Sequence, residues 1–344
     1  MQAMQQPYPI QRGMTMGYYG RPGYYGSDLA KEDVDKMAAL NIDHVCVVVI
    51  VMQETFASIR QFADFKETPP TDEVLRTIDY IHSKGMKVQL RPMLECWDGT
   101  QRINVTFPPE YTVIPGRPIN HFTRWFESMI DRTLYYASFA ERSGCEMFGI
   151  DSEIDQFTGL SSHWKNVVAA ARSVYKGHVT SSHTGRCDFL KDLSDPEHWF
   201  YDLDSVGTSM YHPASDGPGW TKDQMLNKLE KSLLHFREIA ELYGKPFYFG
   251  ETGCCSTAGA TTKPHGWDNP GGYDGEEQAR YLDAVLSKFW DEPWFAGAYW
   301  WKWREHNVRP WLDDDPKGNK GFPVDGKPAA KVMQEWYGRT DRKA

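Results

Sequence analysis

Two glutamates, one on either side of the middle of the sequence, each follow a short apolar segment. Glu153 ends the run FGIDSE at residues 148–153, and Glu251 ends the run FYFGE at residues 247–251. A pair of carboxyl groups is what cleavage of a glycosidic bond requires, because one must protonate the leaving oxygen while the other attacks the sugar or activates water. These two residues are therefore the first candidates for a catalytic pair.

Further polar and aromatic residues lie at or just beyond other apolar segments. Aromatic rings suit such a site because they stack on the flat faces of sugars. Tryptophan, tyrosine and phenylalanine make up 14% of the chain, so we expect some rings to face a ligand rather than the core. The additional candidates are Gln53, Glu54, Arg91, Glu95, Asp151, Ser152, His183, Tyr211, His212, Trp300, Trp301 and Trp303.

The segments that carry these residues alternate between short apolar runs and longer amphipathic stretches. This alternation is typical of parallel strands connected by helices. Strands are predicted at residues 14–20, 44–51, 87–94, 147–150, 178–182, 205–211, 246–250 and 296–301. Helices are predicted at residues 28–40, 71–84, 121–143, 161–175, 221–243, 275–290 and 329–337. The predicted fold class is therefore α/β, a single (β/α)8 TIM barrel, with its active site at the C-terminal ends of the strands.

An open doubly wound sheet is the alternative fold, but no GxGxxG turn follows the first predicted strand. No low-complexity linker divides the chain. We therefore expect one catalytic domain over residues 13–338, preceded by an N-terminal extension at 1–12 and followed by a C-terminal tail at 339–344. The long connection at 95–118 is predicted to be a functional loop because of its length.

Charge and the distribution of apolar residues argue against two kinds of partner. Lysine and arginine total 38 against 47 aspartates and glutamates, which gives a net charge of −9, and no segment concentrates basic residues. Nucleic acid and membrane are therefore not expected as partners. The longest apolar run, 45–52, is too short to span a membrane. No signal peptide is visible, so we expect a cytoplasmic protein, or a secreted one whose signal was removed before this numbering begins.

Longer stretches around both glutamates resemble the retaining glycoside hydrolases of clan A. The resemblance narrows to glycoside hydrolase family 113, the β-mannanases, and covers residues 13–305. It is carried by the ordered motifs VMQETFAS, TPPTDEVLRTIDYIHSKGMKVQLRP, WFESMIDRTLYYASFAERSGCEMF, FGIDSEID, SVGTSMYHP, GKPFYFGETG and GAYWWKW.

The resemblance implies a role for each candidate residue. Glu153 would be the general acid/base, and Glu251 the nucleophile that forms a glycosyl-enzyme intermediate. Tyr211 would donate a hydrogen bond to the nucleophile, whereas Arg91 would either serve the site or pair with a barrel carboxylate such as Glu95. Either Trp300 or Trp301 would floor the subsite of the reacting sugar, because alternation along a strand turns only one of them inward. The remaining substrate-binding candidates are Gln53, Ser152 and His183.

The expected partner is a β-linked oligo- or polysaccharide, most simply β-1,4-mannan, and no cofactor or metal is implied. One residue departs from the clan A pattern, because Ser152 stands where an asparagine usually binds the sugar 2-hydroxyl. Xylan, glucan or galactan therefore remain alternative substrates, and a non-catalytic carbohydrate-binding barrel remains an alternative function. Two other enzyme classes are disfavoured. A metal-dependent barrel hydrolase needs an HxH pair at the end of the first strand, where this sequence has Met14–Met16. A Schiff-base aldolase needs a lysine inside a strand, and the nearest lysine, Lys302, lies at or beyond a strand end.

Overall fold

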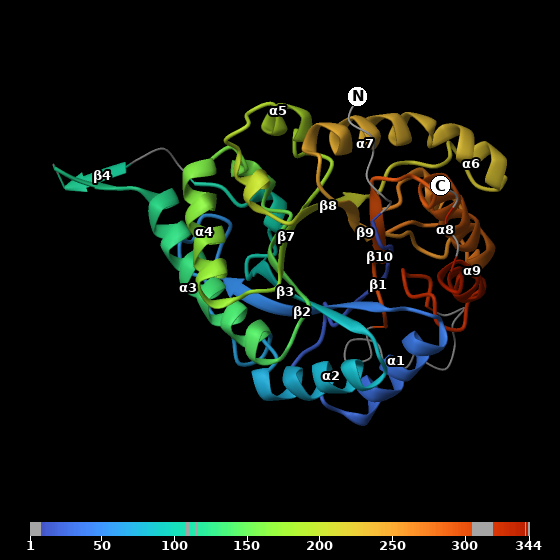
Figure 1. Cartoon of the computed structure of the whole chain (residues 1–344), viewed down its shortest axis with the longest axis horizontal. Helices are drawn as coiled ribbons and strands as arrows, with labels where there is room; N and C mark the ends of the chain where they lie inside the picture. The colour runs from blue at the N-terminus through green and yellow to red at the C-terminus, as the bar shows by residue number, and fades with distance from the viewer. Residues whose placement is uncertain (1–7, 108–110, 115, 305–318, 341, 343–344) are drawn as a thin grey trace.

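Eight parallel strands close into a barrel in the computed structural model, which describes residues 8–107, 111–114, 116–304, 319–340 and 342. The strands lie around the barrel in the order β1, β2, β3, β6, β7, β8, β9 and β10, with β10 beside β1 (Figure 1). The predicted (β/α)8 barrel is therefore confirmed. The strands are β1 (Gln11–Met16), β2 (His44–Gln53), β3 (Lys87–Cys96), β6 (Met147–Ser152), β7 (His178–His183), β8 (Ser205–Met210), β9 (Phe247–Thr252) and β10 (Phe295–Trp300).

Helices cover the outside of the barrel, and their buried residues are mostly apolar. Local signals in the sequence set several helix ends. The Ser27 side chain accepts a hydrogen bond from the Ala30 amide at the start of α1, and Gly244 ends α7 with a left-handed φ of 67°. The helices are α1 (Asp28–Ala39), α2 (Thr71–Ser83), α3 (His121–Arg142), α4 (Ser161–Val174), α5 (Phe189–Leu193), α6 (Lys222–Lys228), α7 (Glu230–Tyr243), α8 (Gly275–Phe289) and α9 (Pro328–Tyr337).

Most predicted boundaries lie within two residues of the observed ones, but one strand and one helix differ more. The strand predicted at 14–20 begins at Gln11, inside the segment expected to be an extension, because Gln11 and Arg12 pair with β10. It ends before Gly17, whose φ of 84° is not that of a strand. The helix predicted at 221–243 is divided at Leu229 into α6 and α7, although its apolar spacing runs through the break.

The loop predicted at 95–118 has secondary structure of its own. A short 3-10 helix, η1 (Arg102–Asn104), follows β3, and a two-stranded antiparallel hairpin, β4 (Tyr111–Ile114) and β5 (Arg117–Ile119), comes next. Figure 1 shows the hairpin projecting away from the barrel beside α3. Within the described part of this loop, η1 therefore lies over the mouth of the barrel, where Arg102 contacts Glu153.

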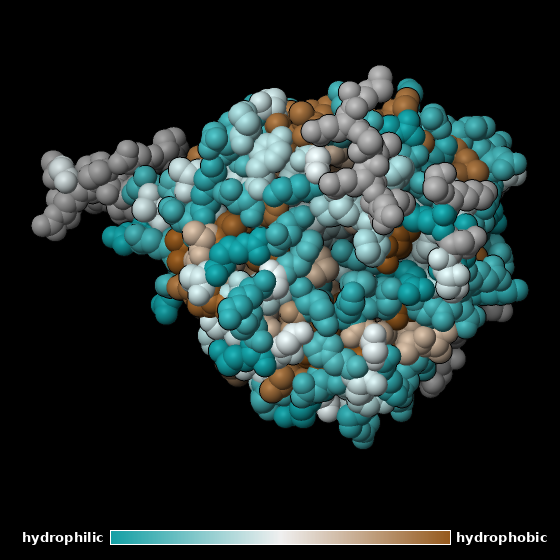
Figure 2. Space-filling view, viewed as in Figure 1, coloured by the Kyte–Doolittle hydropathy of each residue, from teal (hydrophilic) through white to brown (hydrophobic). Residues whose placement is uncertain are grey.

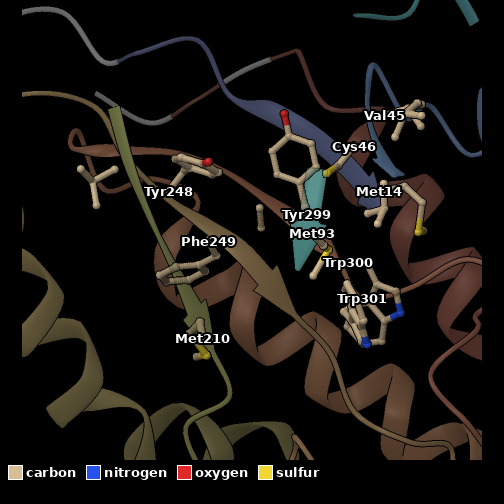
Figure 3. Packing of buried hydrophobic residues seen from close by; sticks show 14 of the residues in the cluster. Met14, Val45, Cys46, Met93, Met210, Tyr248, Phe249, Tyr299, Trp300 and Trp301 are labelled. Atoms are coloured by element: carbon tan, nitrogen blue, oxygen red, sulfur yellow. The ribbon is translucent and has the colours of Figure 1, made fainter. Parts of the chain in front are cut away.

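Two buried tyrosines fill the interior of the barrel, and glycines on neighbouring strands make room for them (Figure 3). A Cβ atom on Gly13 would lie 2.6 Å from the ring of Tyr299, and one on Gly207 would lie 2.8 Å from the ring of Tyr248. Real side chains do not approach this closely. These two glycines are therefore needed for close packing of the barrel interior, which holds the strand ends in fixed positions.

The surface in Figure 2 is mostly hydrophilic, with apolar side chains in small separate groups. No helix among the described residues is long and apolar enough to cross a membrane. Near the chain end, the Arg342 side chain donates hydrogen bonds to the carbonyl oxygens of Tyr8, at 2.7 Å, and Phe295, at 2.9 Å. Arg342, inside the predicted tail, thus joins both ends of the described chain to the barrel.

Candidate active site

The two glutamates meet at the C-terminal end of the barrel, as the sequence predicts. Glu153 directly follows β6, and Glu251 lies in β9. One nitrogen of the Arg102 guanidinium, Nη2, lies 2.8 Å from Glu153 Oε2 and 3.9 Å from Glu251 Oε1. These two oxygens are therefore less than about 7 Å apart, which is at the short end of the range in glycosidases and favours the retaining geometry.

Glu251 is the more deeply buried of the two, with 3% of its side chain exposed. Its Oε2 accepts a hydrogen bond of 3.1 Å from the Tyr211 hydroxyl, and its Oε1 lies 3.7 Å from Arg91 Nη1. Burial, followed by the charge of Glu153, raises the pKa of Glu251 to about 8, against the opposing effect of Arg102 and Arg91. The surroundings of the nucleophile candidate in the free protein therefore favour its protonated form.

Tyr211 and Arg91 lie against Glu251, as the resemblance implies. Burial and the charge of Glu251 raise the pKa of Tyr211 well above its usual value, so its hydroxyl keeps the proton that it donates. The Arg91 guanidinium is fully buried and donates to the Gly250 carbonyl at 3.3 Å from both Nη1 and Nη2. Its carboxylate neighbour is Glu251 and not Glu95, so the ion pair with Glu95 that was considered for Arg91 is not formed.

Both carboxyl oxygens of Glu153 accept hydrogen bonds, an arrangement that suits an ionised group. Ser209 Oγ donates to Oε1 at 2.7 Å, and Arg102 Nη2 donates to Oε2 at 2.8 Å. The backbone of Glu153 has a positive φ of 64°, and its amide donates to the Ser182 carbonyl at 2.8 Å. A left-handed conformation is costly for a residue with a side chain, and such strain is concentrated at functional sites.

Arg102 is the main site residue that the sequence did not single out. It lies in η1, is 8% exposed, and its Nη1 donates to Glu95 Oε1 at 2.5 Å. The same Glu95 oxygen accepts a hydrogen bond of 2.9 Å from the Tyr18 hydroxyl. The available signals were the length of the 95–118 loop and the strand-end position of Glu95, but neither identifies which loop side chain returns to the carboxylates.

Aromatic side chains line the site next to Glu95. The Tyr18 and Trp301 rings meet edge to face with centroids 4.9 Å apart. The Lys302 ammonium lies over this group, 3.9 Å from the centroid of Tyr19 and 4.9 Å from that of Trp267. Cation–π contacts of this kind hold Lys302 among the rings. The Trp267 side chain in this cluster is about half exposed to solvent.

Four other sequence candidates are enclosed by the protein. Gln53 donates to the Thr55 carbonyl at 2.7 Å and accepts from the Trp125 indole at 3.1 Å. The His183 ring nitrogens lie 2.8 Å from Ser181 Oγ and 3.1 Å from Asp155 Oδ1. The Trp300 indole donates to the Phe322 carbonyl at 2.9 Å. Ser152 is buried, and its hydroxyl has no hydrogen-bond partner among the described residues.

These contacts separate two groups of predicted site residues. Arg91, Tyr211 and Glu153 gather around Glu251, and Trp301 packs on Tyr18, whose hydroxyl reaches the Arg102 network. The polar atoms of Gln53, His183 and Trp300 instead fix loops and strand ends. Among the described residues, no group of three or more histidine, cysteine, aspartate or glutamate side chains could hold a metal ion.

A TIM barrel with glutamates at the ends of its fourth and seventh strands, close enough to share an arginine, has the architecture of a clan A glycoside hydrolase. Residues 14–327 match the sequence model of Glycoside Hydrolase Family 113. The match covers most of the chain, which therefore belongs to glycoside hydrolase family 113. This assignment confirms the family that the sequence motifs resemble.

Solved structures agree with this assignment. The β-mannanase AaManA of Alicyclobacillus acidocaldarius, in complex with ManMIm, is 27% identical with a TM-score of 0.82, over 96% of this chain and 97% of that one. A second GH113 β-1,4-mannanase complex is 28% identical with a TM-score of 0.78, over 96% and 99% of the two chains. A family 5 mannosidase from Rhizomucor miehei shares the fold at 14% identity, a TM-score of 0.62, and 97% and 93% coverage. No curated protein matches the sequence.

Proposed function

We propose that this chain is a retaining β-1,4-mannanase that cleaves mannan or manno-oligosaccharides by double displacement. The observation that carries the proposal is the close pair formed by Glu153 and Glu251, which approach one guanidinium nitrogen from two strand ends. The choice of mannan follows from similarity to two GH113 β-1,4-mannanases over almost their whole length.

In the first step Glu251 attacks the anomeric carbon while Glu153 protonates the glycosidic oxygen. The bond between that carbon and the leaving oxygen breaks, the proton of Glu153 leaves with the aglycone, and Glu251 becomes an ester. Tyr211 and Arg91 orient the Glu251 carboxylate for this attack through the contacts at 3.1 and 3.7 Å.

In the second step Glu153 acts as a base. It removes a proton from water, whose oxygen attacks the anomeric carbon and releases Glu251 as a carboxylate. Two inversions at one carbon retain the β configuration. Ser209 supports the ionised state of Glu153 during this step through its hydrogen bond of 2.7 Å.

Trp301 is assigned to the floor of the subsite for the reacting sugar, because it packs on Tyr18, whose hydroxyl contacts Glu95, whereas Trp300 is fixed to Phe322. Ser152 remains the candidate for the sugar 2-hydroxyl, since its own hydroxyl has no partner among the described residues. For mannose this hydroxyl is axial, so a partner other than asparagine is chemically reasonable.

The test is product analysis of the wild-type protein on matched β-1,4-linked manno-, xylo- and gluco-oligosaccharides and on galactan fragments. Cleavage of manno-oligosaccharides with retention of configuration, followed by NMR of the first product, is the expected result. Glu251→Gln is the control, because the amide preserves shape but cannot attack, and its turnover should fall by several orders of magnitude. Cleavage of xylan or glucan alone would refute the substrate, and an inactive wild-type protein would favour a carbohydrate-binding role.

A further inference from the structure

We propose that Arg102 is a positioning residue whose guanidinium moves between Glu153 and Glu251 during turnover, following the single negative charge that the pair carries. The inference rests on the proposed double displacement. Its geometric basis is that the same nitrogen, Nη2, contacts Glu153 at 2.8 Å and already lies 3.9 Å from Glu251. A displacement of about 1 Å exchanges one carboxylate partner for the other, a shift within the ordinary amplitude of side-chain motion.

Arg102 is held in a way that permits such a pivot. Its Nη1 is anchored by Glu95 at 2.5 Å, and Glu95 is fixed in turn by the Tyr18 hydroxyl at 2.9 Å. The Arg102 Nε has no hydrogen-bond partner among the described residues, so rotation about the anchored end breaks no bond there. Arg91 is different, because the carbonyl of Gly250 holds both of its terminal nitrogens. Arg102 is thus the more adjustable of the two cations.

The position of the charge at each stage defines when Arg102 must move. Before the first step Glu251 has to be ionised and Glu153 protonated. After the leaving group departs, Glu251 is a neutral ester and Glu153 is the anion. The pair carries one negative charge in both states, on opposite residues. A guanidinium fixed on Glu153 would favour its ionised form throughout and oppose its action as an acid.

The hydrogen bonds of the free protein suit a pair whose charge lies on Glu153. Both oxygens of Glu153 accept hydrogen bonds, whereas Oε1 of Glu251 accepts none from the described residues. Substrate binding must therefore move one proton from the Glu251 carboxyl to the Glu153 carboxylate. The exchange leaves a Glu251 carboxylate and a Glu153 acid, with no change in total charge. Movement of Arg102 toward Glu251 stabilises this product of the exchange.

Other charged or titratable groups also face the pair, and the test has to separate their effects from that of Arg102. They come from β1, β3, β8, β9 and β10 or the loops that follow these strands. Each is present in wild type and in the Arg102 variants, so a difference between them reports on Arg102. These groups are Tyr18, Arg91, Glu95, Tyr211, His265 and Lys302.

The experiment compares the pH dependence of kcat/KM for wild type, Arg102→Gln and Arg102→Lys on a manno-oligosaccharide. Loss of the cation raises the pKa of the carboxyl pair, so the acidic limb of Arg102→Gln should move to higher pH by about one unit. Its maximal kcat should fall roughly 100-fold, the effect typical of losing one preorganised donor. Arg102→Lys keeps the charge and should retain the wild-type acidic limb with an intermediate kcat. Added guanidinium chloride, at concentrations below those that unfold the protein, should partly restore Arg102→Gln.

Arg124→Gln is the matched control, because Arg124 is an exposed arginine on α3 that pairs with Glu127 at 2.9 Å, and it should behave as wild type. An acidic limb of Arg102→Gln that superimposes on wild type, with no guanidinium rescue, would show that Arg102 only supports the loop and would overturn the inference. That result would leave the proposed function intact, since wild type would still cleave mannan. If Arg102→Gln does not fold, a displaced acidic limb in Arg102→Lys overturns the inference by itself. A wild-type protein that cleaves no glycan refutes the proposed function, and with it the inference.

Discussion

Tyr211→Phe tests whether the hydroxyl of Tyr211 holds Glu251 in its reactive state. The substitution removes one oxygen and leaves the buried ring in place. That oxygen supplies the hydrogen bond of 3.1 Å to Glu251 Oε2, and the other oxygen, Oε1, accepts none from the described residues. The carboxylate therefore depends on this donor and on the more distant charges of Arg91 and Arg102.

The size of the effect follows from these contacts. A hydrogen bond to a charged group contributes about 1.5–3 kcal/mol, which corresponds to a 10- to 150-fold loss of kcat/KM. The same bond lowers the pKa of Glu251, so its loss should raise that pKa further above about 8. The basic limb of the kcat/KM profile, where the singly charged pair loses its remaining proton from Glu251, should accordingly move to higher pH by about one to two units.

The assay is the pH dependence of manno-oligosaccharide cleavage, measured beside Tyr243→Phe. Tyr243 is a buried tyrosine on α7 whose hydroxyl donates to the Phe200 carbonyl at 3.1 Å, outside the barrel. It should lose stability to a similar extent while keeping its pH profile. A Tyr211→Phe enzyme with less than a threefold loss and an unmoved basic limb would refute the role of the hydroxyl in holding Glu251.

Three further predictions concern the carboxylates and the barrel core. Glu153→Ala should slow cleavage of natural mannosides far more than cleavage of aryl mannosides with good leaving groups, and azide should rescue only the aryl mannosides. Equal losses on both substrates in steady-state assays would contradict an acid role. Glu251→Gln should stabilise the fold at high pH, because the pKa of Glu251 is raised in the folded protein. Ionisation of Glu251 therefore begins to lower the free energy of unfolding as pH rises above about 4.5, and its cost is greatest above about 8. Denaturant unfolding should therefore show a gain of a few kcal/mol at pH 9 and little at pH 4, whereas the exposed control Glu335→Gln should show neither. Gly207→Ala should lower the free energy of unfolding by about 1–3 kcal/mol, because the new Cβ would meet the Tyr248 ring at 2.8 Å; an unchanged Tm would show that the ring can move aside.

The barrel and the proximity of the two glutamates were predictable because both depend on local patterns. Apolar runs mark strands covered on both faces, and the run at 44–51 corresponds to β2 almost residue for residue. Strand ends in a barrel converge on one face, so the positions of Glu153 and Glu251 predicted that they meet. Alternation also predicted that Trp300 and Trp301 would differ, and the first is bound to Phe322 while the second packs on Tyr18.

Contacts between distant loops were not predictable in the same way. Arg102 reaches the carboxylates only because η1 folds over the end of β3, and no periodicity encodes that path. Gln53 and His183 lie where a substrate-binding residue could lie, but their partners, Thr55 and Asp155, belong to turns whose course the pattern leaves open. A strand-end position therefore identifies which residues can face the site, and the loops decide which of them do.

The left-handed backbone of Glu153 has a consequence for engineering this protein. At a φ of 64° glycine is unstrained, so Glu153→Gly would relieve a conformational cost of about 1–3 kcal/mol. Selection for heat resistance alone would then enrich chains that have lost the proposed general acid. A thermostability screen of a Glu153 library should therefore measure glycan cleavage in every round, because thermal stability and catalytic activity favour different residues at this position.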